Sequence, residues 1–226
     1  MPSASGTIAD RVATLRERVD AVAVDAGREP GSVAILAVTK TQPRDAVLQA
    51  IGAGLRDVGE NYVQDARSKY VGLPPCTKHF VGHVQTNKAK AMVELFDVVQ
   101  SVDRLTAGIA LANAARAVNK AMRVLVQINI SPSERFGAPP QDAPALADAL
   151  RELGLHVDGV MAIGPLEGDV EGAFSVARAT FERVGGMTLS LGMSGDWETA
   201  VRQGSTMIRL GTAIFGPRTP KEVLAG

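Results

Sequence analysis

The stretch SVAILAVTKTQP, residues 32–43, decides between the two fold classes that the sequence allows. Its first seven residues form an apolar run of the length and composition of a buried strand. An open doubly wound sheet would need a glycine-rich phosphate turn directly after such a first strand. Residues 39–43 contain no glycine. The stretch therefore favours a closed barrel over the open sheet.

Short apolar runs of this kind alternate with amphipathic helical segments along the whole chain. Alternating strands and helices predict a parallel sheet, and eight repeats in about two hundred residues predict a (β/α)8 barrel. The predicted strands cover residues 32–38, 56–59, 79–82, 96–102, 122–130, 156–161, 187–193 and 206–211. The predicted helices cover residues 45–53, 62–69, 87–95, 103–119, 142–153, 169–184 and 197–203.

An extra helix is predicted before the first strand, from about Ile8 to Ala26. Thr7 and Asp10 have the spacing of a capping pair at its start. Its apolar residues recur at spacings of three and four, as on one face of a helix. They are Ile8, Val12, Leu15, Val19 and Val22.

Composition limits the class of protein. No linker-like tract or charge block divides the 226 residues, so we expect one domain over residues 1–226. Lys+Arg and Asp+Glu are equal at 24 each, which indicates neither a nucleic-acid nor a membrane partner. Cys76 is the single cysteine, so no internal disulfide forms. His79 and His83 would not share a helical face, and no metal site is expected. Without a signal peptide pattern at the start, a cytoplasmic protein is expected.

Lys40 is the most informative residue for function. In a (β/α)8 barrel the chemistry lies at the carboxyl ends of the strands, and Lys40 follows the first predicted strand. Its position supports two interpretations about equally: a solvated loop lysine, and a lysine that forms a Schiff base with an aldehyde. Asn61 and Ser194 also follow predicted strands. They indicate a site at this mouth without identifying its ligand.

The turns around the last two predicted strands are typical of a phosphate site, because they are rich in glycine, serine and threonine. Arg209 lies inside the last apolar strand, where a guanidinium needs a partner. It would form a structural ion pair or donate to a ligand, and its position alone favours the ion pair. The candidate phosphate segments are GMSGD (192–196), GST (204–206) and GTAIFG (211–216).

Seven segments resemble the homeostasis proteins that bind pyridoxal 5′-phosphate (PLP), single-domain relatives of the N-terminal barrel of alanine racemase. The segments span nearly the whole chain in one order, and the last is the longest and most specific. They are AVTKTQP (37–43), GENYVQDARSK (59–69), HFVGHVQTNKAK (79–90), SVDRL (101–105), VLVQINIS (124–131), GVMAIGP (159–165) and LSLGMSGDWETAVRQGSTMIRLGTAIFGPR (189–218).

The resemblance implies that Lys40 binds PLP as a Schiff base. Asn61 would lie beside the cofactor ring near its phenolic oxygen, and Met161 would help line the ring pocket. Arg209 would face the pyridine nitrogen and keep it unprotonated, which makes the ring a weaker electron sink than a carboxylate partner would. The phosphate would be held by Ser194, Ser205, Thr206, Gly211 and Thr212.

The resemblance further implies a PLP carrier, which binds, buffers and delivers the cofactor without established catalysis. Amino-acid and keto-acid balance would depend on it, and PLP-dependent apo-enzymes are its candidate recipients. A monomer is expected, because the chain ends soon after the last strand and no second domain completes the site across subunits.

Two alternatives stay open. A weak PLP-dependent amino-acid racemase would need a second base on the opposite face of the ring. A tyrosine from a further domain supplies that base in alanine racemase, whereas this chain offers Tyr62 and Tyr70. A PLP-independent aldolase-like barrel with a Schiff-base lysine would usually carry that lysine on a later strand, where this chain has Met161.

Overall fold

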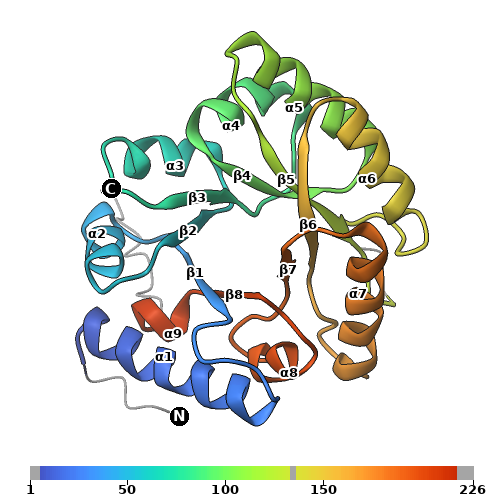
Figure 1. Cartoon of the computed structure of the whole chain (residues 1–226). Helices are drawn as coiled ribbons and strands as arrows, with labels where there is room; N and C mark the ends of the chain where they lie inside the picture. The colour runs from blue at the N-terminus through green and yellow to red at the C-terminus, as the bar shows by residue number, and fades with distance from the viewer. Residues whose placement is uncertain (1–5, 133–135, 218–226) are drawn as a thin grey trace, which may run out of the picture.

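Eight parallel strands close into a barrel in the computed structural model, which describes residues 6–132 and 136–217 (Figure 1). The strands are hydrogen-bonded in sequence order, and β8 pairs with β1. The predicted (β/α)8 barrel is thereby confirmed. The strands are β1 (Ala34–Val38), β2 (Asp57–Glu60), β3 (Thr77–Phe80), β4 (Val98–Val102), β5 (Arg123–Ile128), β6 (His156–Ala162), β7 (Thr188–Ser190) and β8 (Met207–Leu210).

The helices form a ring outside the strands (Figure 1). Each predicted helix is present, although the one at residues 87–95 begins as the short 3-10 helix η1 (Thr86–Lys88). The turn α9 (Thr212–Phe215) was not predicted, because four residues are too few to show a helical period. The others are α2 (Arg44–Gly52), α3 (Val63–Tyr70), α4 (Ala89–Leu95), α5 (Leu105–Ala117), α6 (Ala143–Glu152), α7 (Val170–Val184) and α8 (Trp197–Arg202).

The predicted first helix is α1 (Ile8–Asp25), which packs against α2, α8 and α9 beside the barrel (Figure 1). The Thr7 side chain accepts a hydrogen bond from the Asp10 backbone, and the Asp10 carboxylate accepts one from the Thr7 backbone. This reciprocal pair satisfies two donors at the helix start. The predicted capping pair is confirmed.

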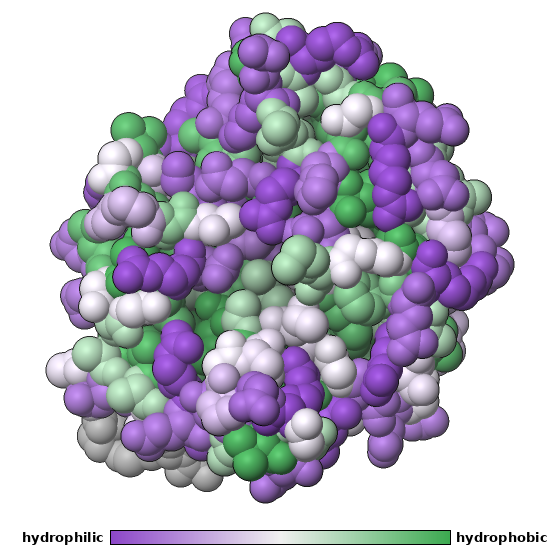
Figure 2. Space-filling model, in the orientation of Figure 1, coloured by the Kyte–Doolittle hydropathy of each residue, from purple (hydrophilic) through white to green (hydrophobic). Residues whose placement is uncertain are grey.

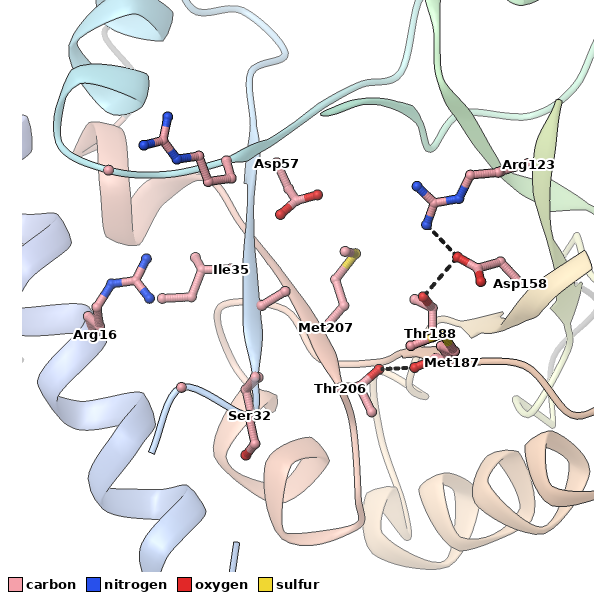
Figure 3. A pocket seen from close by; sticks show the side chains of 15 residues that line it. Arg16, Ser32, Ile35, Asp57, Arg123, Asp158, Met187, Thr188, Thr206 and Met207 are labelled. Atoms are coloured by element: carbon pink, nitrogen blue, oxygen red, sulfur yellow. Dashed lines mark hydrogen bonds and ion pairs between the residues drawn. The ribbon is translucent and has the colours of Figure 1, made fainter. Parts of the chain in front are cut away.

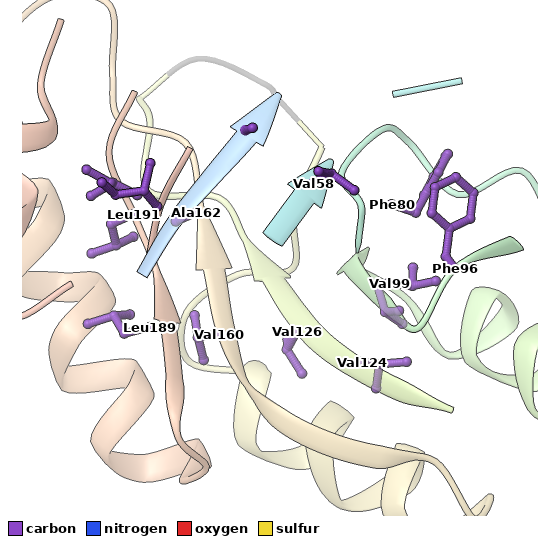
Figure 4. Close-up of a cluster of buried hydrophobic side chains, with 14 of the residues drawn as sticks. Val58, Phe80, Phe96, Val99, Val124, Val126, Val160, Ala162, Leu189 and Leu191 are labelled. Atoms are coloured by element: carbon purple, nitrogen blue, oxygen red, sulfur yellow. The ribbon is translucent and has the colours of Figure 1, made fainter. Parts of the chain in front are cut away.

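Alternate residues of each strand face opposite sides of the barrel wall. Val124 and Val126 of β5 belong to the large cluster between strands and helices (Figure 4). Leu125, between them, belongs to a second cluster with Val98 and Met161, which lies inside the barrel. The same alternation on β1 directs Ile35 and Ala37 to the helices. It therefore directs Leu36, Val38 and Lys40 to the interior.

The seam between β7 and β8 is the shortest in the barrel. Among the described residues it has one registered pair, Ser190 with Met207, whereas β5 and β6 share six. β7 ends earlier than predicted, because the chain turns at Gly192, whose φ is +93°. A Cβ there would lie 2.7 Å from Ala200, so only glycine fits this turn.

Hydrophilic side chains cover most of the face shown in Figure 2, and hydrophobic ones appear in smaller groups between them. Such a surface is typical of helices whose apolar faces lie against a barrel. Over residues 6–132 and 136–217, no helix has both the length and the apolar character to cross a membrane.

Candidate functional site

Lys40 lies at the carboxyl end of β1, where the chain leaves the barrel wall. Its side chain is half-buried. Within the part of the chain that the structure describes, its amine forms no hydrogen bond and has no carboxylate within 4.0 Å. The next residue, Thr41, has a φ of 66°, which is rare for a β-branched residue. Such backbone strain is typical of functional sites, and here it turns the chain directly after the free amine.

A buried ion pair supports the backbone on both sides of Lys40. The Lys69 amine donates to the Glu60 carboxylate and, over 2.8 Å, to the carbonyl oxygen of Thr39. The other Glu60 oxygen accepts a hydrogen bond from the Asn61 backbone at 2.9 Å. Glu60 and Lys69 therefore fix the two strand ends that carry Lys40 and Asn61.

The tyrosines are placed differently from each other. Tyr70 is buried, its hydroxyl lies 2.8 Å from the Thr39 hydroxyl, and burial raises the pKa of Tyr70. It is therefore a neutral structural residue of the Glu60 cluster. Tyr62 is 61% exposed at the start of α3, next to Asn61.

Asn61 presents an unsatisfied acceptor at the same mouth. Its Oδ1 is buried and has no hydrogen-bond partner among the described residues. The backbone of Asn61 lies tightly against Gly82, where a Cβ would approach the Asn61 carbonyl oxygen to 2.1 Å. An unpaired buried acceptor costs about 1–3 kcal/mol. The Oδ1 of Asn61 is therefore a candidate contact for a ligand at this mouth.

Arg209 lies inside the barrel on β8 and is buried. Its Nη1 donates to the carbonyl oxygen of Ser190 at 2.7 Å, and its Nη2 donates to that of Ala162 at 2.8 Å. Burial lowers the pKa of Arg209 to about 10, an effect that the negative charge of Asp196 partly offsets. No described carboxylate lies within 4.0 Å, so the ion pair that its position favoured does not form. Met161 lies in the neighbouring interior cluster, 1% exposed.

The loops after β7 and β8 reach the same mouth. Ser194 is exposed in the turn before α8, and the Asp196 carboxylate fixes this turn by accepting from the Met193 backbone at 2.6 Å. Thr212 begins α9, whose first N–H groups have no acceptor within the helix. A Cβ on Gly211 would lie 3.4 Å from the Val38 carbonyl oxygen, which places this loop beside the end of β1.

Comparisons with known proteins identify the family of this chain. The family model for the N-terminal domain of alanine racemase matches residues 11–219. The pyridoxal phosphate homeostasis protein of Pseudomonas aeruginosa is 41% identical over 225 residues, 94% of this chain and 96% of that protein. The protein of that name in Escherichia coli K12 is 39% identical over 226 residues, 93% and 97% of the two chains.

This chain belongs to the pyridoxal phosphate homeostasis protein family.

Solved structures of the family share the fold over nearly their whole length. PipY of Synechococcus elongatus with PLP bound matches with a TM-score of 0.80 at 33% identity, covering 93% of this chain and all of that one. A protein of Bifidobacterium adolescentis matches with a TM-score of 0.85 at 32% identity, over 92% and 94% of the two chains. A Clostridium difficile alanine racemase, at 12% identity and a TM-score of 0.65, shares the barrel fold alone.

Two residues that the family resemblance placed at the phosphate lie at the wrong end of the barrel. Ser205 and Thr206 precede β8, and Thr206 accepts at its carbonyl from the Ala34 backbone, at the start of β1. Gly211 is five residues further on, roughly 16 Å along a strand. The prediction that Ser205 and Thr206 share a site with Gly211 is therefore wrong. It overlooked that residues before a strand lie at the opposite end from those after it.

Ser205 has a structural role instead. It is fully buried, and its hydroxyl lies 3.1 Å from the Leu189 oxygen and 3.0 Å from the oxygens of Leu191 and Met207. The Leu191 backbone donates to this hydroxyl. Ser205 thus connects the ends of β7 and β8, where regular pairing is short.

A cavity of about 440 Å³ opens at the amino ends of the strands, opposite Lys40 (Figure 3). Its lining includes both paired and unpaired charges, and the side chains of Arg16 and Arg56 have no partner among the described residues. Arg123 contacts Asp158, which also accepts from the Thr188 hydroxyl at 3.3 Å. The lining also includes Asp57, Thr206, Met207 and Ser32, whose buried hydroxyl has no partner among the described residues.

Sequence reasoning missed Glu60 and Lys69. A signal was present, because α3 buries Val63, Ala66 and Tyr70 on one face, and Lys69 falls on that face. A lysine on the apolar face of a helix needs a buried partner. Nothing in the sequence showed that this partner was Glu60.

Proposed function

We propose that this chain binds PLP through Lys40 and acts in PLP homeostasis as a carrier of the cofactor. The observation that carries the proposal is the half-buried, unpaired amine of Lys40 at the carboxyl end of β1. Membership of the family supports it, as does PipY, which is similar over the whole barrel and is described with PLP bound.

The residues at this mouth fit the chemistry of PLP. When bound, PLP supplies an aldehyde with which the neutral amine of Lys40 forms a Schiff base and releases water. The Oδ1 of Asn61 has no hydrogen-bond donor among the described residues, and a protonated or hydrated group beside the ring would supply one. Ser194 and the first N–H groups of α9, at Thr212, offer donors to a phosphate. Gly211 allows this loop to approach β1.

Arg209 favours a carrier over an enzyme. A guanidinium only donates hydrogen bonds, so a pyridine nitrogen that accepts from it stays unprotonated. The ring then withdraws electrons weakly, which disfavours carbanion chemistry. Met161, beside Arg209 in the barrel interior, would contact the ring through its thioether.

The decisive experiment is a visible absorption spectrum of the purified protein, followed by borohydride reduction and peptide mass mapping. We expect a yellow protein, with the reduced pyridoxyl group on the peptide that contains Lys40. Lys40→Ala should lose the band, whereas Lys90→Ala, on the exposed side of α4, should keep it. A wild-type protein that stays colourless with added PLP would refute the proposal.

A weak amino-acid racemase is the alternative, and one observation favours it: the exposed phenol of Tyr62 adjoins Asn61 at the rim. Tyr70 does not serve as the base, because it is buried against Thr39. Conversion of L-alanine to D-alanine by the pure protein, lost in both Lys40→Ala and Tyr62→Phe, would establish the racemase. Absence of turnover in the PLP-loaded wild type leaves the carrier.

We also propose that the PLP-loaded protein is a monomer, that PLP-dependent apo-enzymes receive its cofactor, and that it acts in the cytoplasm. The proposed residues of the site all come from one barrel, which supports the monomer. Size-exclusion chromatography with absorbance detection would contradict it by finding PLP on a dimer alone. Transfer is tested by mixing the loaded protein with an apo-transaminase and measuring the recovery of its activity.

A further inference from the structure

A continuous row of hydrogen bonds crosses the barrel interior and ends at Arg209. It joins side chains from β2, β3, β4, β7 and β8. His79, Gln100, Ser190 and Arg209 are all buried. The row consists of Asp57 Oδ1 to His79 Nε2 at 2.8 Å, His79 Nδ1 to Gln100 Nε2 at 2.9 Å, Gln100 Oε1 to Ser190 Oγ at 2.8 Å, and Ser190 Oγ to Arg209 Nη1 at 2.8 Å.

The hydrogen bonds of the row share one direction, which begins at the guanidinium. Arg209 can only donate, so Ser190 Oγ accepts from it and donates its own proton to Gln100 Oε1. The amide nitrogen of Gln100 therefore faces His79 and donates to Nδ1. Since His79 Nδ1 accepts, the ring proton is on Nε2, which donates to Asp57. All donors point from Arg209 toward Asp57.

The row of hydrogen bonds connects the buried guanidinium of Arg209 with the carboxylate of Asp57. Arg209 has no carboxylate within 4.0 Å among the described residues, and a buried charge needs compensation. The Asp57 side chain is 20% exposed and lines the cavity at the amino ends of the strands (Figure 3). Hydrogen bonds in such chains polarise one another, so Asp57 and Arg209 are coupled electrostatically through the three side chains between them.

We propose that Asp57, His79, Gln100 and Ser190 form a relay that positions the Arg209 guanidinium for the cofactor ring. The inference rests on the proposed function, because it takes the pyridine nitrogen as the acceptor of Arg209. The four are positioning residues: each acts through Arg209 and none touches the cofactor. The relay sets how firmly the guanidinium is held and thereby tunes the electronic state of the bound ring.

The first test compares the PLP-loaded Gln100→Leu and Ser190→Ala variants with the wild type. Gln100→Leu removes the relay bonds to His79 and Ser190, and Ser190→Ala removes those to Gln100 and Arg209. Both variants leave Arg209 bonded to the carbonyl oxygens of Ser190 and Ala162. Ser190→Ala loses a hydrogen bond to the charged Arg209 and should speed PLP release about tenfold, and Gln100→Leu should change the release rate in the same direction. The absorption and emission maxima of the bound cofactor should also shift, which a purely structural defect would not cause. His156→Gln, at an exposed histidine outside the relay, is the control and should match the wild type.

The second test uses the unliganded protein, so it does not depend on PLP binding. The chain has three histidines, which makes the ring nitrogens resolvable by ¹⁵N NMR. We expect His79 to be neutral, with its proton on Nε2 and an unprotonated Nδ1. Gln100→Leu should change the ¹⁵N shifts of His79, whereas His156→Gln should leave them unchanged.

The outcomes separate the two proposals. A wild type that takes up no PLP overturns the proposed function, and the NMR result then decides the relay alone. A wild type that binds PLP, with unchanged release rates and spectra in both relay variants, overturns the relay and leaves the carrier. A proton on His79 Nδ1 also overturns the relay, because Gln100 could then not donate to it.

Discussion

The two mouths of the barrel differ in how their polar atoms are satisfied. At the amino ends of the strands, Asp158 is paired with Arg123 and Asp57 with His79, around the 440 Å³ cavity. At the carboxyl ends the amine of Lys40 and the Oδ1 of Asn61 have no partner in the described structure. The 440 Å³ cavity is therefore at the mouth where the two carboxylates are paired, and the unpaired amine of Lys40 is at the other.

This difference shows that hollow shape alone does not identify a site in this protein. A carboxylate that is already paired gains little from a ligand, whereas an unpaired buried group is costly until a ligand satisfies it. The amino end of a barrel generally serves stability and the carboxyl end serves chemistry. The two carboxylates of the amino end, Asp57 and Asp158, are paired, whereas Arg16, Arg56 and the buried hydroxyl of Ser32 there have no partner among the described residues.

The largest expected difference is between two lysines near Thr39: Lys69, which donates to its carbonyl oxygen, and Lys40, which follows it in the chain. Lys69→Met should leave Glu60 buried without its partner and lower the free energy of unfolding by about 3–5 kcal/mol, on the order of 10 °C in Tm. Lys40→Met should change the stability of the unliganded protein little and abolish PLP uptake. Thermal unfolding and PLP absorbance measure the two. As a control, Arg178→Met breaks an exposed pair with Glu182 and should cost below about 1 kcal/mol. Equal stability of the Lys40 and Lys69 variants would contradict the comparison.

A smaller effect is expected at the amino mouth. Arg123→Met should leave the buried carboxylate of Asp158 with only Thr188 and the distant His156, and lower the free energy of unfolding by about 1–3 kcal/mol. PLP release should stay within about twofold of the wild-type rate, since the mutation leaves every proposed cofactor contact in place. Urea unfolding and release kinetics on one preparation test both statements. Loss of PLP binding in a folded Arg123→Met would show that the amino mouth takes part in the site.

Asn61→Leu should act in opposite directions on stability and binding. The change removes a buried acceptor without a partner, so the free energy of unfolding of the unliganded protein should rise by about 1 kcal/mol. PLP affinity should fall in the same variant. Asn113→Leu on the exposed side of α5 serves as the control, because its Oδ1 already accepts from Arg116. A destabilised Asn61→Leu would mean that this atom is satisfied in solution.

The smallest effect concerns Cys76, which precedes β3 at the amino end of the barrel. Burial raises the pKa of the Cys76 thiol, so the thiolate fraction at a given pH is lower than in a free cysteine. Iodoacetamide should therefore alkylate it more slowly than free cysteine at pH 8, and faster once urea unfolds the chain. Cys76→Ala should bind PLP normally. Rapid alkylation of the folded protein would place a second reactive nucleophile at the amino mouth.

Much of the fold could be predicted because its signals are local. The strand at 32–38 and the helix from Ile8 each show their period within a few residues, and both are present. The β7 strand was predicted too long because residues 191–193 are apolar, although Gly192 ends the strand by a turn that the pattern does not reveal.

The site was predictable as far as it follows strand order. Lys40, Asn61, Ser194 and Thr212 do lie at carboxyl ends of strands, and their roles toward PLP stay predictions. The relay was beyond sequence reasoning, because its residues come from five strands and show no shared spacing. The position of a residue on its strand predicts the end of the barrel at which it lies, but only the folded barrel shows which side chains contact one another.

The short seam between β7 and β8 also has a consequence for how the barrel opens. Ser190 and Met207 are its one registered pair in the described chain, and the backbone bonds of Leu191 and Thr206, the Ser205 hydroxyl and the Arg209 guanidinium also join the two strands. The loops with Ser194 and Thr212 leave the barrel on the two sides of this seam. A phosphate held by both loops would add a further connection across the seam with the fewest registered strand pairs. Amide hydrogen exchange should then slow first along β7 and β8 as the cofactor binds.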